Sequence, residues 1–207
     1  NSDNTAETQV ELNVDNSTAV PQGGNITSVM YDLESMTVTW EASKDGDFRD
    51  YKLLYSTTED GGKDTVGIYT DKTTTTYIVT DFDPTHENWF WVQVTDTLGL
   101  KSIGSGMTNS LNSIPTPISV TSVTYDLESM IITWEISNDD DFVSYELLQS
   151  DTEDGTYTSV VTVTDQSITS HSLTEFDPIQ RNWFKVKVTD HWGLTSIGDE
   201  MPNGIEP

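Results

Sequence analysis

The chain is a gapless internal duplication, and this feature constrains its fold more than any other. The hexapeptide Tyr31–Met36 recurs unchanged as Tyr125–Met130. The offset is constant at 94 residues, since Trp40 matches Trp134 and no gap is needed anywhere between the copies. Self-similarity at one fixed period indicates that a single supersecondary unit has been duplicated. A chain of 207 residues is therefore expected to form two modules rather than one large domain.

The position of the repeat defines the expected domains. Two prolines fall between the copies, at Pro115 and Pro117, and they favour a short and fairly stiff linker. We therefore predict an N-terminal extension at 1–25, a first module at 26–112, a linker at 113–119 and a second module at 120–207.

Within each copy the hydrophobic pattern has a period of two. Met36, Val38 and Trp40 alternate with polar neighbours, and the second copy repeats this pattern. About seven such runs per copy are separated by clusters of Asp, Gly, Asn and Ser at intervals of 8–12 residues, which is typical of a two-sheet sandwich. The predicted fold class is all-β.

The residues of each copy resemble those of a fibronectin type III domain. The resemblance rests on Trp40 in the second predicted strand, on Tyr51–Tyr55 in the third, and on Tyr77–Pro84 leading into Phe90–Val94. It implies two tandem immunoglobulin-like sandwiches of about seven strands each. One feature departs from the family: the tyrosine that usually begins the sixth strand and holds the preceding corner is replaced by Phe90, and by its counterpart in the second copy. We therefore expect the corner to be held by another group.

The charge balance excludes some partners. The net charge is −26, with 35 acidic and nine basic residues. Binding to a nucleic-acid backbone or to an anionic membrane needs clustered cations, so neither is expected. There is no cysteine and no apolar run long enough to cross a bilayer, so disulfides and membrane insertion are not expected either.

Two acidic loops offer oxygen ligands for a cation. They follow the second predicted strand of each copy and contain Asp45, Asp47 and Asp50 in the first, and Asp139 and Asp141 in the second. Alternating aspartates on a flexible loop suit calcium, but the twelve-residue spacing of a specific calcium loop is missing. Aspartate is also favoured in ordinary turns, so a calcium site and a solvated acidic turn are both open interpretations. No other cofactor is expected.

Several aromatic residues are candidates for an interaction surface. Trp89, Trp91 and Leu54 are out of phase with the core and could form an apolar patch on the outer face of one sheet, for a protein or a sugar ring. Trp183 repeats Trp89, and both could instead fold under the corner as its anchor. Trp192 lies on a predicted loop and could likewise either belong to an interaction surface or fold against its own module.

The first residues contain one amphipathic strand. Val10, Leu12 and Val14 alternate with polar residues on a segment outside the repeat. A lone strand is unstable in water, so this one is expected to pair with its own module or with the edge of a neighbouring subunit. Asn16 and Asn25 begin N-glycosylation sequons.

These features predict a non-enzymatic function. No catalytic constellation is visible, and a duplicated β-sandwich with a Ser- and Thr-rich surface is typical of a secreted or cell-surface spacer, adhesive or filament module. Its expected partners are proteins, including copies of itself. The alternative is a carbohydrate-binding accessory module, in which Trp89, Trp91 or Trp192 stacks on sugar rings.

Overall fold

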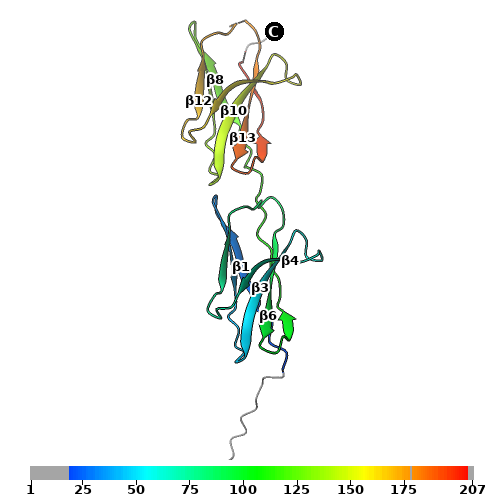
Figure 1. The fold of residues 1–207 in the computed structure, drawn as a ribbon. Helices are drawn as coiled ribbons and strands as arrows, with labels where there is room; N and C mark the ends of the chain where they lie inside the picture. The colour runs from blue at the N-terminus through cyan, green and yellow to red at the C-terminus, as the bar shows by residue number, and fades with distance from the viewer. Residues whose placement is uncertain (1–18, 178, 205–207) are drawn as a thin grey trace, which may run out of the picture. The chain divides into compact units, whose positions relative to one another are not determined.

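A computed structural model describes residues 19–177 and 179–204. Every regular element in these residues is a β-strand, which confirms the all-β prediction, and no helix there could cross a membrane. The chain divides into two compact units, 1–110 and 111–207 (Figure 1). The amphipathic segment with Val10, Leu12 and Val14, together with the sequon residue Asn16, lies outside the described residues.

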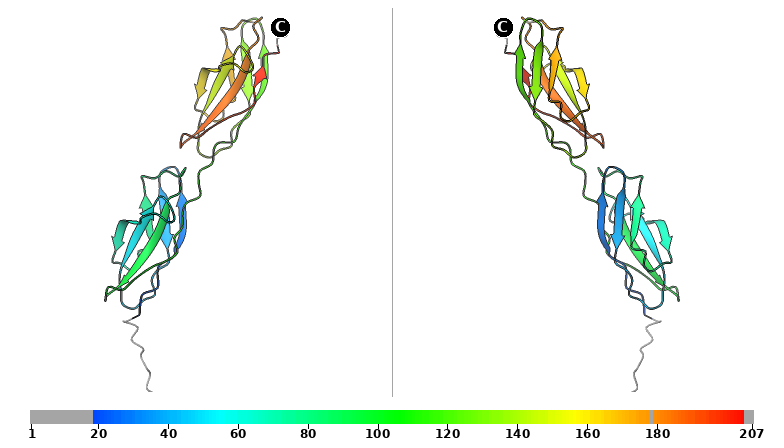
Figure 2. Two further views of the ribbon diagram at one scale, coloured as in Figure 1. Left: turned by 90° about the vertical axis from the view of Figure 1, so that its right-hand side faces the viewer. Right: turned by 90° about the vertical axis from the view of Figure 1, so that its left-hand side faces the viewer.

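The first unit is a sandwich of two antiparallel sheets. One sheet has the order β1-β2-β5 and the other the order β4-β3-β6-β7 (Figures 1 and 2). This is the arrangement that the fibronectin type III resemblance implies. The strands are β1 (Ile26–Tyr31), β2 (Met36–Trp40), β3 (Phe48–Ser56), β4 (Asp64–Tyr69), β5 (Thr76–Val79), β6 (Trp89–Asp96) and β7 (Lys101–Ile103).

The second unit repeats this topology, with sheets β12-β9-β8 and β11-β10-β13-β14, and β15 pairs with β13. Its strands are β8 (Val120–Tyr125), β9 (Met130–Trp134), β10 (Phe142–Ser150), β11 (Thr158–Val163), β12 (Ser170–Leu173), β13 (Trp183–Asp190), β14 (Thr195–Ile197) and β15 (Met201–Pro202). The place of β15 is taken in the first unit by a single bridge between Met107 and Phe90.

Each core lies between its two sheets and uses the residues that alternate inward. In the first unit the buried cluster comprises Ile26, Val29, Met36, Val38, Trp40, Tyr51, Leu53, Phe90, Val92 and Val94. The second cluster has the matching residues, except that Val123, the counterpart of Val29, is only partly buried, and it adds Ile118. Since neighbouring residues on a strand point to opposite faces, this pattern also determines which side chains reach each outer surface.

The segment before the first strand of each unit belongs to the sandwich. The backbone N–H of Gln22 donates to Asp45 Oδ2 at 3.2 Å, and that of Thr116 donates to Asp139 Oδ2 at the same distance. Ile118 lies in the second core, although it falls in the stretch 113–119 that the prolines suggested as a linker. Residues 115–119 are thus part of the second sandwich, as 21–25 are of the first.

Candidate interaction surfaces

The predicted aromatic patch lies on the outer face of the four-stranded sheet in the first unit. Trp89 and Trp91 project from β6 and stack with ring centroids 5.7 Å apart and planes 18° apart. Leu54 on β3 is directly opposite Trp91 in the sheet register. However, Trp91 is only 7% exposed and Leu54 only 6%, so the patch is not open to a partner.

The chain itself covers Trp91. The ammonium group of Lys63 lies 4.0 Å from the centroid of the Trp91 ring. Gly106 packs so closely that a Cβ atom there would be 2.2 Å from Trp91 Nε1. The expectation that Trp91 and Leu54 form an exposed platform is therefore wrong: both side chains are buried, and Lys63, Gly106 and the stacked Trp89 cover Trp91.

The second unit builds the same place with exchanged residue types. The counterparts of Lys63, Trp91 and Gly106 are Tyr157, Lys185 and Glu200. The Lys185 ammonium lies 4.6 Å from the Tyr157 ring centroid and 3.1 Å from Glu200 Oε2.

The cation and the aromatic ring have thus changed places between the two units. In the first unit Gly106 leaves space for the tryptophan ring, whereas its counterpart in the second unit, Glu200, supplies a carboxylate. The hydrogen bond to Glu200 raises the pKa of Lys185, and the same bond lowers the pKa of Glu200, so this pair is charged at neutral pH. A contact between a cation and an aromatic ring stabilises both units here.

The remaining candidate tryptophans are half-buried. Trp89 donates its Nε1–H to Glu87 Oε2 at 2.8 Å. Trp183 packs against the guanidinium of Arg181, whose Cζ atom lies 5.0 Å from the ring centroid. Trp192 makes an edge contact with the ring of His191, at a centroid distance of 4.9 Å.

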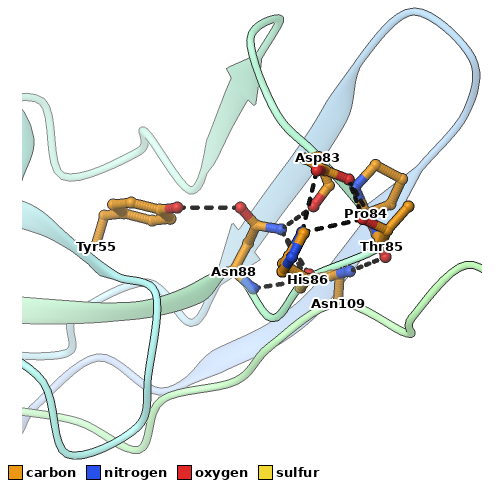
Figure 3. Close-up of polar contacts among 7 residues, drawn as sticks. All are labelled: Tyr55, Asp83, Pro84, Thr85, His86, Asn88 and Asn109. Atoms are coloured by element: carbon orange, nitrogen blue, oxygen red, sulfur yellow. Dashed lines mark hydrogen bonds and ion pairs between the residues drawn. The ribbon is translucent and has the colours of Figure 1, made fainter. Parts of the chain in front are cut away.

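The corner before β6 is anchored by an asparagine. Asn88 is buried, and its Nδ2 donates to the carbonyls of Asp83 at 2.9 Å and His86 at 3.0 Å, while its Oδ1 accepts the Tyr55 hydroxyl at 3.1 Å. Its backbone N–H donates to Asn109 Oδ1 at 2.8 Å. Figure 3 shows Tyr55 and Asn109 reaching Asn88 from opposite sides. Asn88 thus holds the corner, and an additional anchoring role of Trp89 stays a prediction from the sequence.

The second corner keeps this design with one change of residue. Asn182 Nδ2 donates to the Gln180 carbonyl at 3.0 Å, and its Oδ1 accepts Gln149 Nε2 at 2.7 Å. Gln149 is the counterpart of Tyr55, so an amide replaces a phenol as the donor. The backbone N–H of Asn182 donates to Asn203 Oδ1 at 3.3 Å, as that of Asn88 does to Asn109.

The acidic loops are organised as turns. Asp45 Oδ2 accepts the Ser43 hydroxyl at 3.0 Å, and Asp139 Oδ2 accepts the Ser137 hydroxyl at 2.8 Å. Asp50 is buried beside Arg49, whose Nε lies 2.8 Å from Asp50 Oδ2.

Asp47 and Asp141 fix the neighbouring loop through their backbone, because their carbonyls accept the N–H groups of Thr97 and His191. Among residues 19–177 and 179–204, no three His, Asp or Glu side chains are placed to hold a metal ion together. Calcium binding by these loops stays a prediction from the sequence.

The sequon at Asn25 is tied into the fold. Its Nδ2 donates to Glu41 Oε2 at 3.0 Å, and its Oδ1 accepts the backbone N–H of Ser105 at 2.9 Å. The nitrogen that would carry a glycan is thus already hydrogen-bonded within the first unit.

Sequence reasoning missed two exposed apolar features. Leu127 is 99% exposed at the tip of the turn between β8 and β9, and Leu33 is its counterpart between β1 and β2. The available signal in the sequence was the hexapeptide Tyr31–Met36, which recurs unchanged as Tyr125–Met130 and contains these two leucines. Met30 and Ile78 project from the outer face of the three-stranded sheet, where period two alone does not distinguish a solvated position from a contact position.

Comparison with known proteins finds similarity to solved structures and to no family model or curated sequence. No family model matches the chain, and no curated protein sequence matches it. Among solved structures, the chain is similar to the crystal structure of the chicken CNTN1 FN1–FN3 domains, with 15% sequence identity and a TM-score of 0.39, over 88% of this chain and 67% of that one. Each unit of this chain is a fibronectin type III-like sandwich by the strand order of its own sheets.

Proposed function

We propose that this chain is a non-enzymatic structural module pair of a secreted or cell-surface protein, which acts through protein–protein contacts. The supporting observation is the kind of difference between the two units. Where Lys63 and Trp91 become Tyr157 and Lys185, the side chains change together and the contact between them persists. Such paired changes preserve the shape of a module.

Other paired positions agree with this pattern. Lys72 donates its ammonium to the Asp45 carbonyl, and its counterpart Gln166 donates its Nε2 to the Asp139 carbonyl at 3.0 Å. Lysine and glutamine share a side chain long enough to reach this carbonyl and an N–H group that donates to it. What has been kept in the duplication is therefore a framework, as a repeated building block requires.

The specific form of the proposal is a subunit of a surface filament or repeat array. Electron microscopy of the native material, together with sizing of the 1–207 chain, tests it. Ordered fibres that disappear when residues 1–15 are deleted would support assembly through the N-terminal strand. A monodisperse monomer without fibres would overturn the filament and leave a spacer.

The carbohydrate-binding alternative is weakened, because its best candidate residue is buried. Trp91, the best candidate for sugar stacking, is buried under Lys63 and beside Gly106. Retention on a polysaccharide that is abolished by Trp89→Ala or Trp192→Ala would revive this alternative.

A further inference from the structure

The three-stranded sheet of each unit carries no charged residue in its strands. Within β1, β2 and β5, and within β8, β9 and β12, there is not one Asp, Glu, Lys or Arg. The whole chain holds 35 acidic and nine basic residues, so this absence is not a property of its composition. Both units share it although their strand sequences differ.

The outward side chains of this face form two rows across the sheet. In the first unit, the sheet register places Ser28 beside Thr39 and Thr76, and it places Met30 beside Thr37 and Ile78. In the second unit the rows are Ser122, Thr133 and Ser170, and Thr124, Ile131 and Ser172. We name these twelve residues the neutral face.

The neutral face is exposed and partly apolar. Met30 is 70% exposed, Ile78 60% and Ile131 43%. The strands of the opposite sheets, by contrast, do carry charged residues: Arg49, Lys52, Glu146, Lys185 and Lys187. Nine of the twelve residues of the neutral face are serine or threonine, and the feature that this face shares with the centre of a protein interface is the absence of charged residues.

The partner that this face fits is a second copy of the same chain. With a net charge of −26, two copies repel each other, and most approaches would bring carboxylates into contact. An approach through two neutral faces brings together strands that carry no charged residue, and it lets serine and threonine hydroxyls pair as donor and acceptor.

The size of the face sets the strength of the contact. Three strands about 4.8 Å apart and about five residues long cover roughly 250 Å². A stable pair of proteins buries about 800 Å² on each partner, so a single neutral face is too small for a tight dimer. Each chain carries the face twice, however, and several weak contacts in an array combine into a strong one.

We propose that the neutral faces mediate weak lateral self-association of this chain, as side-to-side contacts within the array. This inference rests on the proposed structural function and names a joint different from the N-terminal strand. Salt strengthens the association because it screens the repulsion between the acidic copies.

The test is sedimentation velocity of the full chain at rising protein concentration and at two salt concentrations. The variant Thr37→Glu/Ile131→Glu places a carboxylate in the middle of each neutral face. The control Ile68→Glu puts one such carboxylate on β4, in the opposite sheet of the first unit, where Ile68 is 57% exposed, and it is compared with Thr37→Glu alone as well as with the double variant. Circular dichroism checks that all variants are folded. A second, uncharged variant, Met30→Ser/Ile78→Ser, removes apolar surface from the first face alone.

We expect reversible association of the wild type that increases with salt and is weakened at least about tenfold by Thr37→Glu/Ile131→Glu. Met30→Ser/Ile78→Ser should weaken it to a smaller extent, and Ile68→Glu should leave it intact. A wild type that stays monomeric at both salt concentrations up to about 1 mM would overturn the inference. Equal losses in Ile68→Glu and in the neutral-face variant would overturn it as well.

Electron microscopy separates this inference from the filament proposal. If neutral-face variants still form fibres that no longer bundle, both the filament and the lateral contact are supported. If the wild type forms no fibres but pairs through the neutral face, the filament fails and the lateral contact stands.

Discussion

The asparagine corner gives the sharpest test of how each module is held together. Substituting Asn88→Ala removes a buried amide that bonds to the Tyr55 hydroxyl and to the carbonyls of Asp83 and His86, and of these the Asp83 carbonyl keeps only the His86 N–H, at 3.3 Å. A neutral hydrogen bond contributes about 1 kcal/mol net, and a buried polar group left unpaired costs about 1–3 kcal/mol. The expected loss in unfolding free energy is therefore about 3 kcal/mol.

Scanning calorimetry of the full chain measures this loss. For a module of this size, about 3 kcal/mol corresponds to a fall in Tm of roughly 12–20 °C. The matched change Asn182→Ala should lower the transition of the second unit instead. Tyr55→Phe removes a single bond and should cost about 1 kcal/mol.

The variant Asn88→Asp isolates the role of the donating amide. It keeps the acceptor for Tyr55 but turns a carboxylate toward the carbonyls of Asp83 and His86. The folded protein would raise the pKa of this carboxyl, so the module should be least stable at neutral pH and recover as the pH falls through that pKa. If Asn88→Ala costs no more than Tyr55→Phe, or if Asn88→Asp matches the wild type at pH 7, the amide does not hold the corner.

Four further predictions concern the cation–π site, the turn at Asp32 and the net charge of the chain. In a double-mutant cycle, Lys63→Tyr and Trp91→Lys should each destabilise the first unit, and their combination should recover about 0.5–1 kcal/mol as the exchanged pair forms. Gly106→Ala should cost about 1–3 kcal/mol in the wild type because its Cβ would strike Trp91, and it should cost little in the Trp91→Lys background. The backbone N–H groups of Glu34 and Ser35 lower the pKa of Asp32, so the stability that this turn contributes should be present above about pH 4 and be lost on further acidification. At neutral pH, added salt should raise the Tm of the chain, because it screens the repulsion among the negative charges.

The sequence predicted what depends on local pattern. The alternation in β2 and β6 identified the inward residues correctly, because successive side chains of a strand point to opposite faces of the sheet. It could not predict the burial of Trp91, since the covering residues Lys63 and Gly106 come from separate segments. The anchor of the corner was missed for a similar reason: Asn109, which binds Asn88, lies 21 residues further along the chain.

The prolines misled for a physical reason. Proline fits an extended segment at the margin of a sheet as well as it fits a linker, because neither requires its missing N–H. The hydrogen bond from Thr116 to Asp139 and the burial of Ile118 distinguish the two cases, and both are tertiary contacts.

The exchange of cation and aromatic ring between the two units also affects whether these similar neighbours can exchange strands during folding. Misassembly by strand exchange is a characteristic failure of tandem repeats. If β13 took the place of β6, Lys185 would meet Lys63, and two ammonium groups would face each other without a ring between them. In the reverse exchange Trp91 would meet Tyr157 and Glu200, where its larger indole has no space left by a glycine. The reversal of this cation–π contact should therefore disfavour the exchange of β6 and β13 between the two sandwiches.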